Sequence, residues 1–201
     1  MKLLHISDWH ATPGQARIKL KTIPDLNYAA VAITGDMWAD LDAEWQRDAW
    51  KVLVKDIGER WPGRPIVIVY GNHDKYLGPI RGAKVFNKGA HNYTANGVKF
   101  TGLYVPTIQI KGAATLLPEV EWFEKQIPKL DSCADVLLCH YPSNYLPHMD
   151  FWLDSEPTPS AYLSGHIHED FGVSLNSGDL YSGTSRLHSN ASQGYTVIDT
   201  Y

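Results

Sequence analysis

Short apolar runs alternate with helical patterns along the chain, and this alternation predicts an α/β layered fold. Strands are expected where apolar and β-branched residues run together. These runs are residues 3–6, 29–34, 65–70, 135–139 and 161–164, with shorter strands between 83 and 104. The run at 65–70 is nearly all β-branched, which predicts a strand buried on both faces. Asn96-Gly97 predicts a hairpin turn within the shorter strands.

Two segments carry apolar residues at helical spacing. The first extends from Asp40, which would cap it, to Arg60. Its expected apolar side consists of Leu41, Trp45, Ala49, Val52 and Leu53. The second runs from about Pro118, suited to a first helical turn, to Leu130.

Two further segments show no helical period. Residues 171–201 alternate strand-like and turn-like positions, which predicts an antiparallel meander. The Pro- and aromatic-rich segment 141–159 predicts a long irregular loop, and loops of this length in a compact domain are often functional. Cys139 lies in an apolar run and is expected to be a buried thiol.

Composition narrows the class of protein. With 201 residues, 44% hydrophobic and 20% charged, the chain is expected to form a single domain over residues 1–201 rather than a disordered or fibrous protein. A net charge of −4 argues against a surface built mainly for nucleic-acid backbone. There is no apolar stretch of membrane-spanning length, the start lacks a signal-peptide pattern, and two Cys cannot form a disulfide framework. We therefore expect a cytoplasmic protein with no membrane partner.

Five polar blocks each follow a strand-like run directly. They are Asp8-Trp9-His10, Gly35-Asp36, Gly71-Asn72-His73-Asp74, His140 and Gly165-His166-Ile167-His168. Taken singly, most of them have an ordinary explanation, such as a turn or an exposed histidine pair. Because the carboxyl ends of strands meet at one edge of a sheet, the five together predict one site.

The residue types in these blocks indicate metal chemistry. Carboxylate, amide and imidazole donors together suit Mn²⁺, Fe or Zn²⁺ better than Mg²⁺ or Ca²⁺, which favour all-oxygen ligands. The donors are too numerous for one four-coordinate ion, whereas two ions that share a bridging carboxylate would use them all. We expect two divalent metal ions, with Mn²⁺ favoured and Fe or Zn²⁺ as alternatives.

From Asp8 to His168, with all five blocks present, the chain resembles the calcineurin-like metallophosphoesterases. The resemblance implies a four-layer αββα sandwich of two mixed β-sheets flanked by helices. It also implies a first ion bound by Asp8, His10 and His168, a bridging Asp36, and a second ion completed by Asn72, His140 and His166. His73 would be the catalytic histidine, which contacts the phosphate and assists the leaving group.

Departures from the motifs of protein Ser/Thr phosphatases favour another branch of this superfamily. Those enzymes carry Gly-Asp-x-x-Asp-Arg-Gly and Gly-Asn-His-Glu, whereas this chain has Ala39 and Asp74 at the corresponding acidic positions and no Arg. The blocks look more like those of phosphodiesterases and nucleases, and 201 residues leave no room for the added segments of the repair nucleases. Which carboxylate orients His73 stays open between Asp40 and Asp74.

We therefore expect a phosphodiesterase that hydrolyses a nucleotide or another small phosphodiester. The alternatives are a phosphomonoesterase, then a nuclease that binds nucleic acid, then a non-catalytic scaffold of the same fold. Two further residues are weaker candidates for the site: Arg186, which could bind a phosphate, and His91. The aromatic residues after His140 could stack a base or close a lid, and core packing explains them equally well; they are Tyr141, Tyr145, Phe151 and Trp152.

Overall fold

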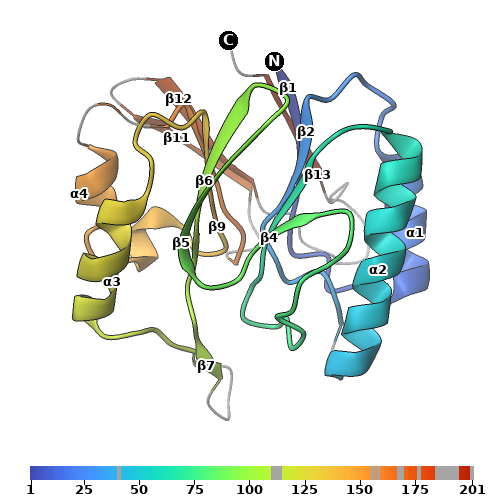
Figure 1. Ribbon diagram of the computed structural model, residues 1–201, viewed down its shortest axis with the longest axis horizontal. Coiled ribbons are helices and arrows are strands. Elements are labelled where there is room, and N and C mark those ends of the chain that lie inside the picture. The colour runs from blue at the N-terminus through green and yellow to red at the C-terminus, as the bar shows by residue number, and fades with distance from the viewer. Residues whose placement is uncertain are drawn as a thin grey trace.

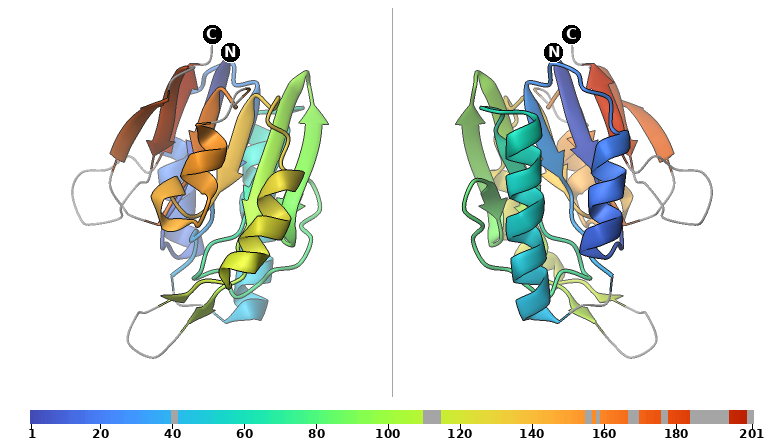
Figure 2. Two further views of the ribbon diagram at one scale, coloured as in Figure 1. Left: turned by 90° about the vertical axis from the view of Figure 1, so that its left-hand side faces the viewer. Right: turned by 90° about the vertical axis from the view of Figure 1, so that its right-hand side faces the viewer.

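Four layers of secondary structure, in the order helix, sheet, sheet, helix, make up the protein (Figure 1). The structure, a computed structural model, describes residues 1–39, 42–109, 115–154, 157, 159–166, 170–175, 178–183 and 195–199. Helices α1 (Pro13–Thr22) and α2 (Ala43–Arg60) lie side by side on one outer face (Figure 2). Helices α3 (Val120–Gln126) and α4 (Met149–Leu153) lie on the opposite face. The expected αββα sandwich is confirmed.

The first sheet is mixed and lies against α1 and α2. Its strands are, in spatial order, β13 (Tyr195–Asp199), β1 (Lys2–Ile6), β2 (Ala30–Ile33), β3 (Ile66–Val69) and β4 (Lys84–Phe86). Strands β1 to β4 run parallel, and β13 pairs with β1 antiparallel. The carboxyl ends of β1, β2 and β3 therefore lie together at one edge of the sheet.

The second sheet is also mixed and lies against α3 and α4. Its strands are, in spatial order, β10 (Ala161–Leu163), β9 (Val136–Cys139), β6 (Val98–Tyr104) and β5 (Gly89–Ala95). Strands β10, β9 and β6 are parallel, whereas β5 and β6 form an antiparallel hairpin. The expected turn at Asn96-Gly97 is confirmed, since both residues have positive φ, 50° and 78°.

Short elements complete the described part of the chain. They are the hairpins β7 (Ile108–Gln109) with β8 (Thr115–Leu116) and β11 (Asp170–Leu175) with β12 (Gly178–Gly183), and the 3₁₀ helices η1 (Ile127–Lys129) and η2 (Ser143–Tyr145). None of the helices described here is both long and apolar enough to cross a membrane.

Alternating side chains along the central strands pack in different apolar layers. On β1, Leu4 packs with the residues under α1 and α2, while Leu3 packs with those between the two sheets. On β9, Leu138 lies between the sheets and Leu137 packs under α3 and α4. All four strand positions of β3 are buried, as the β-branched run predicted. Both sheets are thus held in place from both faces, which fixes the edge where their parallel strands end.

Helix α2 begins two residues later than expected and presents a different side to the core. Asp42, not Asp40, is its N-cap, and the Asp42 carboxylate accepts a hydrogen bond from Trp45 N at 2.9 Å. Trp45 is 66% exposed, whereas Gln46 is fully buried. Ala49 and Leu53 are buried as expected, but the pattern placed Trp45 inward because Gln46 takes the buried position to bind backbone, and a hydrophobic pattern does not reveal a buried polar residue.

Three other expectations need correction. Pro118 precedes α3, whose N-cap is Glu119. The segment 141–159 contains η2 and α4, where the pattern predicted only an irregular loop. The C-terminal part is no simple meander, because β13 leaves the β11–β12 hairpin and pairs with β1.

Helix α1 was missed because it buries only Ala16 and Leu20 among its residues. A capping box between Thr12 and Gln15 marks its start.

Of the two cysteines, Cys139 is buried as expected and Cys133 is exposed.

Candidate metal centre

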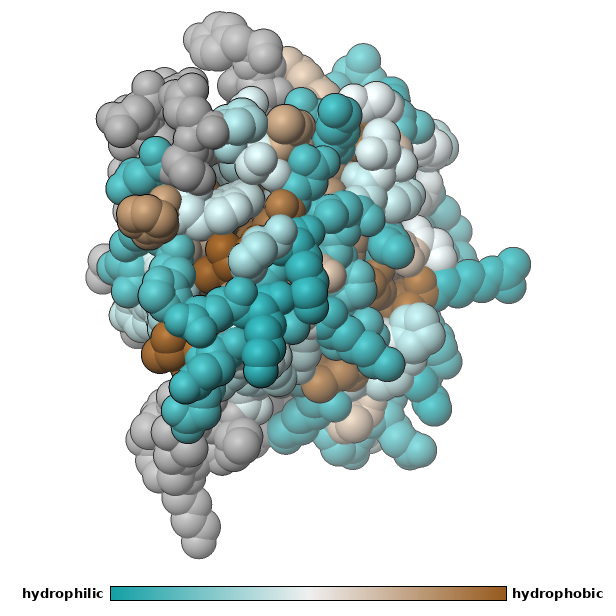
Figure 3. Space-filling model, turned by 60° about the vertical axis from the view of Figure 1, so that its left-hand side comes forward, coloured by the Kyte–Doolittle hydropathy of each residue, from teal (hydrophilic) through white to brown (hydrophobic). Residues whose placement is uncertain are grey.

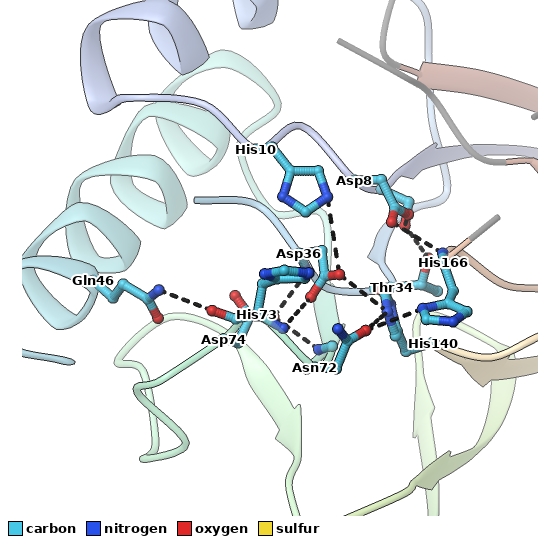
Figure 4. Close-up of polar contacts among 12 residues, drawn as sticks. Asp8, His10, Thr34, Asp36, Gln46, Asn72, His73, Asp74, His140 and His166 are labelled. Atoms are coloured by element: carbon cyan, nitrogen blue, oxygen red, sulfur yellow. Dashed lines mark hydrogen bonds and ion pairs between the residues drawn. The ribbon is translucent and has the colours of Figure 1, made fainter. Parts of the chain in front are cut away.

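The candidate residues gather where the parallel strands of both sheets end (Figure 4). Asp8 and His10 follow β1, Asp36 follows β2, and Asn72 and His73 follow β3. The second sheet contributes His140 directly after β9 and His166 shortly after β10. The structure thus brings together seven of the eight predicted site residues, and the eighth, His168, lies outside the described residues.

Backbone conformation at this edge is unusual. Four candidate ligands have positive φ: Asp8 at 51°, His10 at 41°, Asp36 at 52° and His166 at 77°. Residues with a Cβ rarely adopt this region, and each such residue costs about 1–3 kcal/mol, which surrounding interactions have to offset. Backbone hydrogen bonds between the loops contribute to this here, since Asp8 N donates to Gly35 O and His10 N to Asp36 O, both at 3.0 Å.

Glycines in two of the motifs make room for these side chains. A Cβ on Gly71 would collide with the Asp36 carboxylate and lie 2.7 Å from His140 Cε1. A Cβ on Gly165 would collide with the side chains of Asp8 and Ser7. The glycines at these positions are therefore required by close approach to the ligands themselves.

Two groups of potential ligand atoms share one carboxylate. Asp8, His10 and Asp36 form one group, and Asp36, His140 and His166 form the other. Within each group the ligand atoms lie within 4.8 Å of one another. Asp36 is thus the carboxylate that belongs to both, and two neighbouring cations could share it.

Asn72 points its side-chain oxygen into the second group. Asn72 Oδ1 lies 2.9 Å from His140 Nε2 and 3.0 Å from His166 Nδ1, and His140 Nε2 lies 3.2 Å from Asp36 Oδ2 (Figure 4). His140 turns its other nitrogen, Nδ1, to Thr34 O at 2.7 Å. A backbone acceptor on one nitrogen leaves the other aimed at the site, as metal-binding histidines usually are. The donor set and its convergence therefore fit a divalent metal ion.

Electrostatics at the shared carboxylate also suit a cation. Burial would raise the pKa of Asp36, but the nearby imidazoles, His140 foremost, outweigh it and lower the pKa. Burial would lower the pKa of His140, but the charge and hydrogen bond of Asp36 raise it to about 9. The pair carries a buried negative charge on Asp36 that His140 balances.

Asp74 ties two of the ligand loops together. Its Oδ2 accepts hydrogen bonds from Gly71 N at 2.8 Å and from Asp36 N at 2.9 Å. Burial, together with the charge of Asp36, raises the pKa of Asp74 to about 7. Asp40 and Asp74 are the two carboxylates considered for orienting His73. Asp74 binds the backbone N–H groups of Gly71 and Asp36. Asp40 lies outside the described residues.

His73 is exposed and lies against the first ligand group. Its ring meets that of His10 edge-on at 5.0 Å between centroids. Its backbone is fixed twice, because His73 N donates to Asp36 Oδ1 at 2.7 Å and Gln46 Nε2 donates to His73 O at 3.1 Å. Gln46 Oε1 also accepts from Lys75 N and Tyr76 N, so one buried side chain of α2 holds this loop. Sequence reasoning missed Gln46, whose only signal is a polar residue within the buried side of a helix.

A buried chain of hydrogen bonds lies beneath Asp8. His5 Nε2 is 2.8 Å from Thr34 Oγ1, Thr34 Oγ1 donates to Ser7 Oγ at 2.8 Å, and Ser7 Oγ donates to the Asp8 carboxylate. Asp8 also accepts from His166 N at 3.0 Å, which connects the two sheets. Sequence reasoning missed these residues too, although each is a polar residue in or next to a buried strand.

Of the weaker candidates, His91 is not part of this group of described residues. It lies on β5, stacks on Phe86 at 5.1 Å and accepts a hydrogen bond from Lys88 N. Arg186 lies outside the described residues.

Solved structures of similar fold include proteins with different roles. A dimetal phosphatase from Danio rerio matches with a TM-score of 0.61 and 12% identity, over 92% of this chain and 87% of that chain. Phosphopantetheinyl hydrolase from Mycobacterium tuberculosis matches with a TM-score of 0.53 and 14% identity, over 92% and 89% of the two chains. The anchor protein of the inner membrane complex of Plasmodium matches with a TM-score of 0.55 and 18% identity, over 98% and 80%. At these identities the likeness shows the fold alone.

Sequence comparison gives the family. No curated protein sequence matches the chain significantly. The family model for calcineurin-like phosphoesterases matches residues 1–170, which include every candidate ligand. The chain therefore belongs to the calcineurin-like phosphoesterase family.

Proposed function

We propose that the protein is a dinuclear-metal phosphodiesterase whose substrate is a nucleotide or another small phosphodiester. The observation that carries this proposal is the position of Asp36, which belongs to both groups of potential ligands. A carboxylate shared in this way can lie between two cations. Membership of the calcineurin-like phosphoesterase family supports hydrolysis of a phosphoester.

The ligands divide between two ions. Asp8 and His10 would hold the first ion, with His168 as a further ligand on the strength of the sequence resemblance. Asn72, His140 and His166 would hold the second, and Asp36 would bridge the two. Mn²⁺ suits this mixture of oxygen and nitrogen donors, and Fe and Zn²⁺ are the alternatives. When bound, the two ions supply charge neutralisation and a hydroxide nucleophile near neutral pH.

His73 is the residue best placed to act on the leaving group. It is exposed at the site, its ring lies against His10, and its backbone is fixed by Asp36 and Gln46. An imidazole in this position can donate a proton to the departing oxygen, an effect worth about 10²- to 10⁴-fold in rate. Phosphoryl transfer otherwise depends on positioning and charge more than on covalent help from the protein.

Asp74 supports the diesterase reading over that of a protein phosphatase. The protein phosphatases carry Glu at this position, and here the shorter Asp74 binds the backbone of Gly71 and Asp36. A non-catalytic scaffold remains an alternative because an anchor protein shares the fold. It is the weaker of the two. The chain nevertheless retains the ligand residues and His73, and a scaffold has no evident use for them.

The test compares two substrates with and without metal. Metal-stripped protein is assayed on bis-p-nitrophenyl phosphate and p-nitrophenyl phosphate before and after addition of Mn²⁺, with Asp36→Asn as the control variant. We expect Mn²⁺-dependent hydrolysis, faster on the diester, and a loss of at least about 10²-fold in Asp36→Asn. Faster cleavage of the monoester would replace the proposal by a phosphomonoesterase. Absence of hydrolysis with Mn²⁺ bound would overturn it in favour of a scaffold.

A further inference from the structure

Two tyrosines that follow His140 in the sequence, Tyr141 and Tyr145, lie beside His166, which comes shortly after β10 of the second sheet. The ring centroids of Tyr141 and His166 are 4.6 Å apart. The ring of Tyr145 meets the same imidazole edge-on, with 5.6 Å between the ring centroids. Their burial differs sharply, because Tyr141 is 2% exposed and Tyr145 is 46% exposed. Tyr141 is therefore part of the core, whereas Tyr145 presents much of its ring to solvent next to a candidate metal ligand.

The backbone that carries Tyr145 is fixed by its neighbours. Leu146, Met149 and Leu153 are all buried and pack in the apolar layer under α3 and α4. Within η2, Tyr145 N donates to Pro142 O at 3.0 Å and Leu146 N to Ser143 O at 2.9 Å. The anchors hold the segment without any contribution from the exposed part of the Tyr145 ring, so the backbone that carries the ring is in place before a ligand binds.

The surroundings argue for a small ligand at Tyr145. On the face drawn in Figure 3, which includes α3 and α4, hydrophobic residues form small patches separated by hydrophilic ones. The neighbouring exposed aromatic of the same segment, Phe151, is 81% exposed on α4. A protein partner would call for a broad apolar patch. A half-exposed ring beside a metal ligand suits a single planar group instead.

The arrangement of the site gives this group a direction. Figure 4 shows His73 and His166 on opposite sides of Asp36. In a tetrahedral phosphodiester the second ester substituent points away from the leaving oxygen, so a diester whose leaving oxygen faces His73 has room to extend that substituent toward His166, beside which Tyr145 lies.

We propose that Tyr145 stacks against the planar base of a nucleoside phosphodiester and so determines specificity for nucleoside esters over alkyl esters. The inference rests on the proposed function, because the phosphate has to lie at Asp36. Stacking of a base on an aromatic side chain contributes about 1–3 kcal/mol and does not depend strongly on which base is bound.

The test uses two diesters with the same leaving group, the p-nitrophenyl esters of thymidine 5′-phosphate and of methyl phosphate. Tyr145→Leu removes the planar ring, Tyr145→Phe keeps it, and Phe151→Leu is the matched control on the same segment. We expect the ratio of kcat/KM for the thymidine ester to that for the methyl ester to fall about 10-fold in Tyr145→Leu. The ratio should be retained in Tyr145→Phe and in Phe151→Leu.

A second readout needs no turnover. Calorimetric titration with a non-hydrolysable thymidine phosphonate should show Kd rising about 10-fold in Tyr145→Leu and staying near the wild-type value in Tyr145→Phe. An unchanged ratio and Kd in Tyr145→Leu would overturn the inference, as would an equal change in Phe151→Leu. If the Mn²⁺-loaded wild-type protein hydrolyses neither ester, the proposed function fails; if it hydrolyses both with a ratio indifferent to residue 145, only the stacking inference fails.

Discussion

The two sheets contribute to the candidate metal centre in different ways. The first sheet contributes Asp8, His10 and Asp36 on loops that bind one another through backbone hydrogen bonds and that hold three of the four candidate ligands with positive φ. The second sheet contributes His140 and His166 among the described residues, and both reach across to the first. His140 Nδ1 binds Thr34 O, and His166 N donates to Asp8 Oδ1.

This difference indicates that the two sheets have different roles in the site. The first sheet assembles a cross-linked set of loops in which strain and close approach are balanced by hydrogen bonds. The second sheet adds imidazoles, and their geometry depends on how the two sheets pack. The apolar layer between the sheets therefore helps to determine the geometry of the site.

The largest expected effect separates the contribution of His140 from that of His10. In metal-free protein, His140→Leu should lower the free energy of unfolding by about 3 kcal/mol or more, because it leaves the buried Asp36 charge without a partner 3.2 Å away. His10→Leu should cost less than about 1 kcal/mol, because His10 is 25% exposed and 3.9 Å from Asp36. Urea denaturation of both variants measures the difference. Equal losses would show that the second sheet gives Asp36 no special support.

An intermediate effect is expected from the buried chain beneath Asp8. Thr34→Val removes the hydroxyl that joins His5 to Ser7 but keeps the carbonyl that binds His140. Groups hydrogen-bonded directly to metal ligands are typically worth about 10- to 100-fold in metal affinity; because the Thr34 hydroxyl reaches Asp8 through Ser7, Mn²⁺ binding measured by calorimetry should weaken by about 10-fold, the lower end of that range.

The matched control is Thr101→Val on β6 of the second sheet. Thr101 is equally buried, and its hydroxyl is 2.7 Å from Asn92 Oδ1. This variant should lose stability without losing Mn²⁺ affinity. If it weakened Mn²⁺ binding as much as Thr34→Val does, the effect would be one of general stability rather than of positioning.

The smallest effect concerns the other buried histidine of the site region. Burial lowers the pKa of His5 to about 4, in contrast to His140. In the unfolded chain His5 is protonated below about pH 6.5, whereas in the folded protein it is protonated only below about pH 4. The free energy of unfolding therefore falls as the pH falls from about 6.5 to about 4. At pH 5.5 this loss amounts to about 1 kcal/mol.

His5→Gln should remove that part of the pH dependence. Chemical denaturation of metal-free wild type and variant at pH 7.5 and 5.5 gives the comparison. A pH dependence of the same size in both proteins would show that His5 is not held neutral in the folded state.

The sequence alone determined the layered α/β class, the strands that carry the motifs, and the identity of the residues that meet at the site. These features are readable because they depend on local chemistry. β-branched runs make buried strands, and glycines precede ligands such as Asp36 and His166 where backbones and side chains approach closely.

Only the tertiary structure decided which residues hold the candidate ligands in place. Gln46, Thr34 and His5 act through contacts with segments 27 to 29 positions away in the chain. Local periodicity even placed Trp45 inward instead of Gln46, and Asp40 instead of Asp42 as the cap. A buried polar side chain is stable only when a distant partner satisfies its hydrogen bonds, and local sequence does not specify that partner.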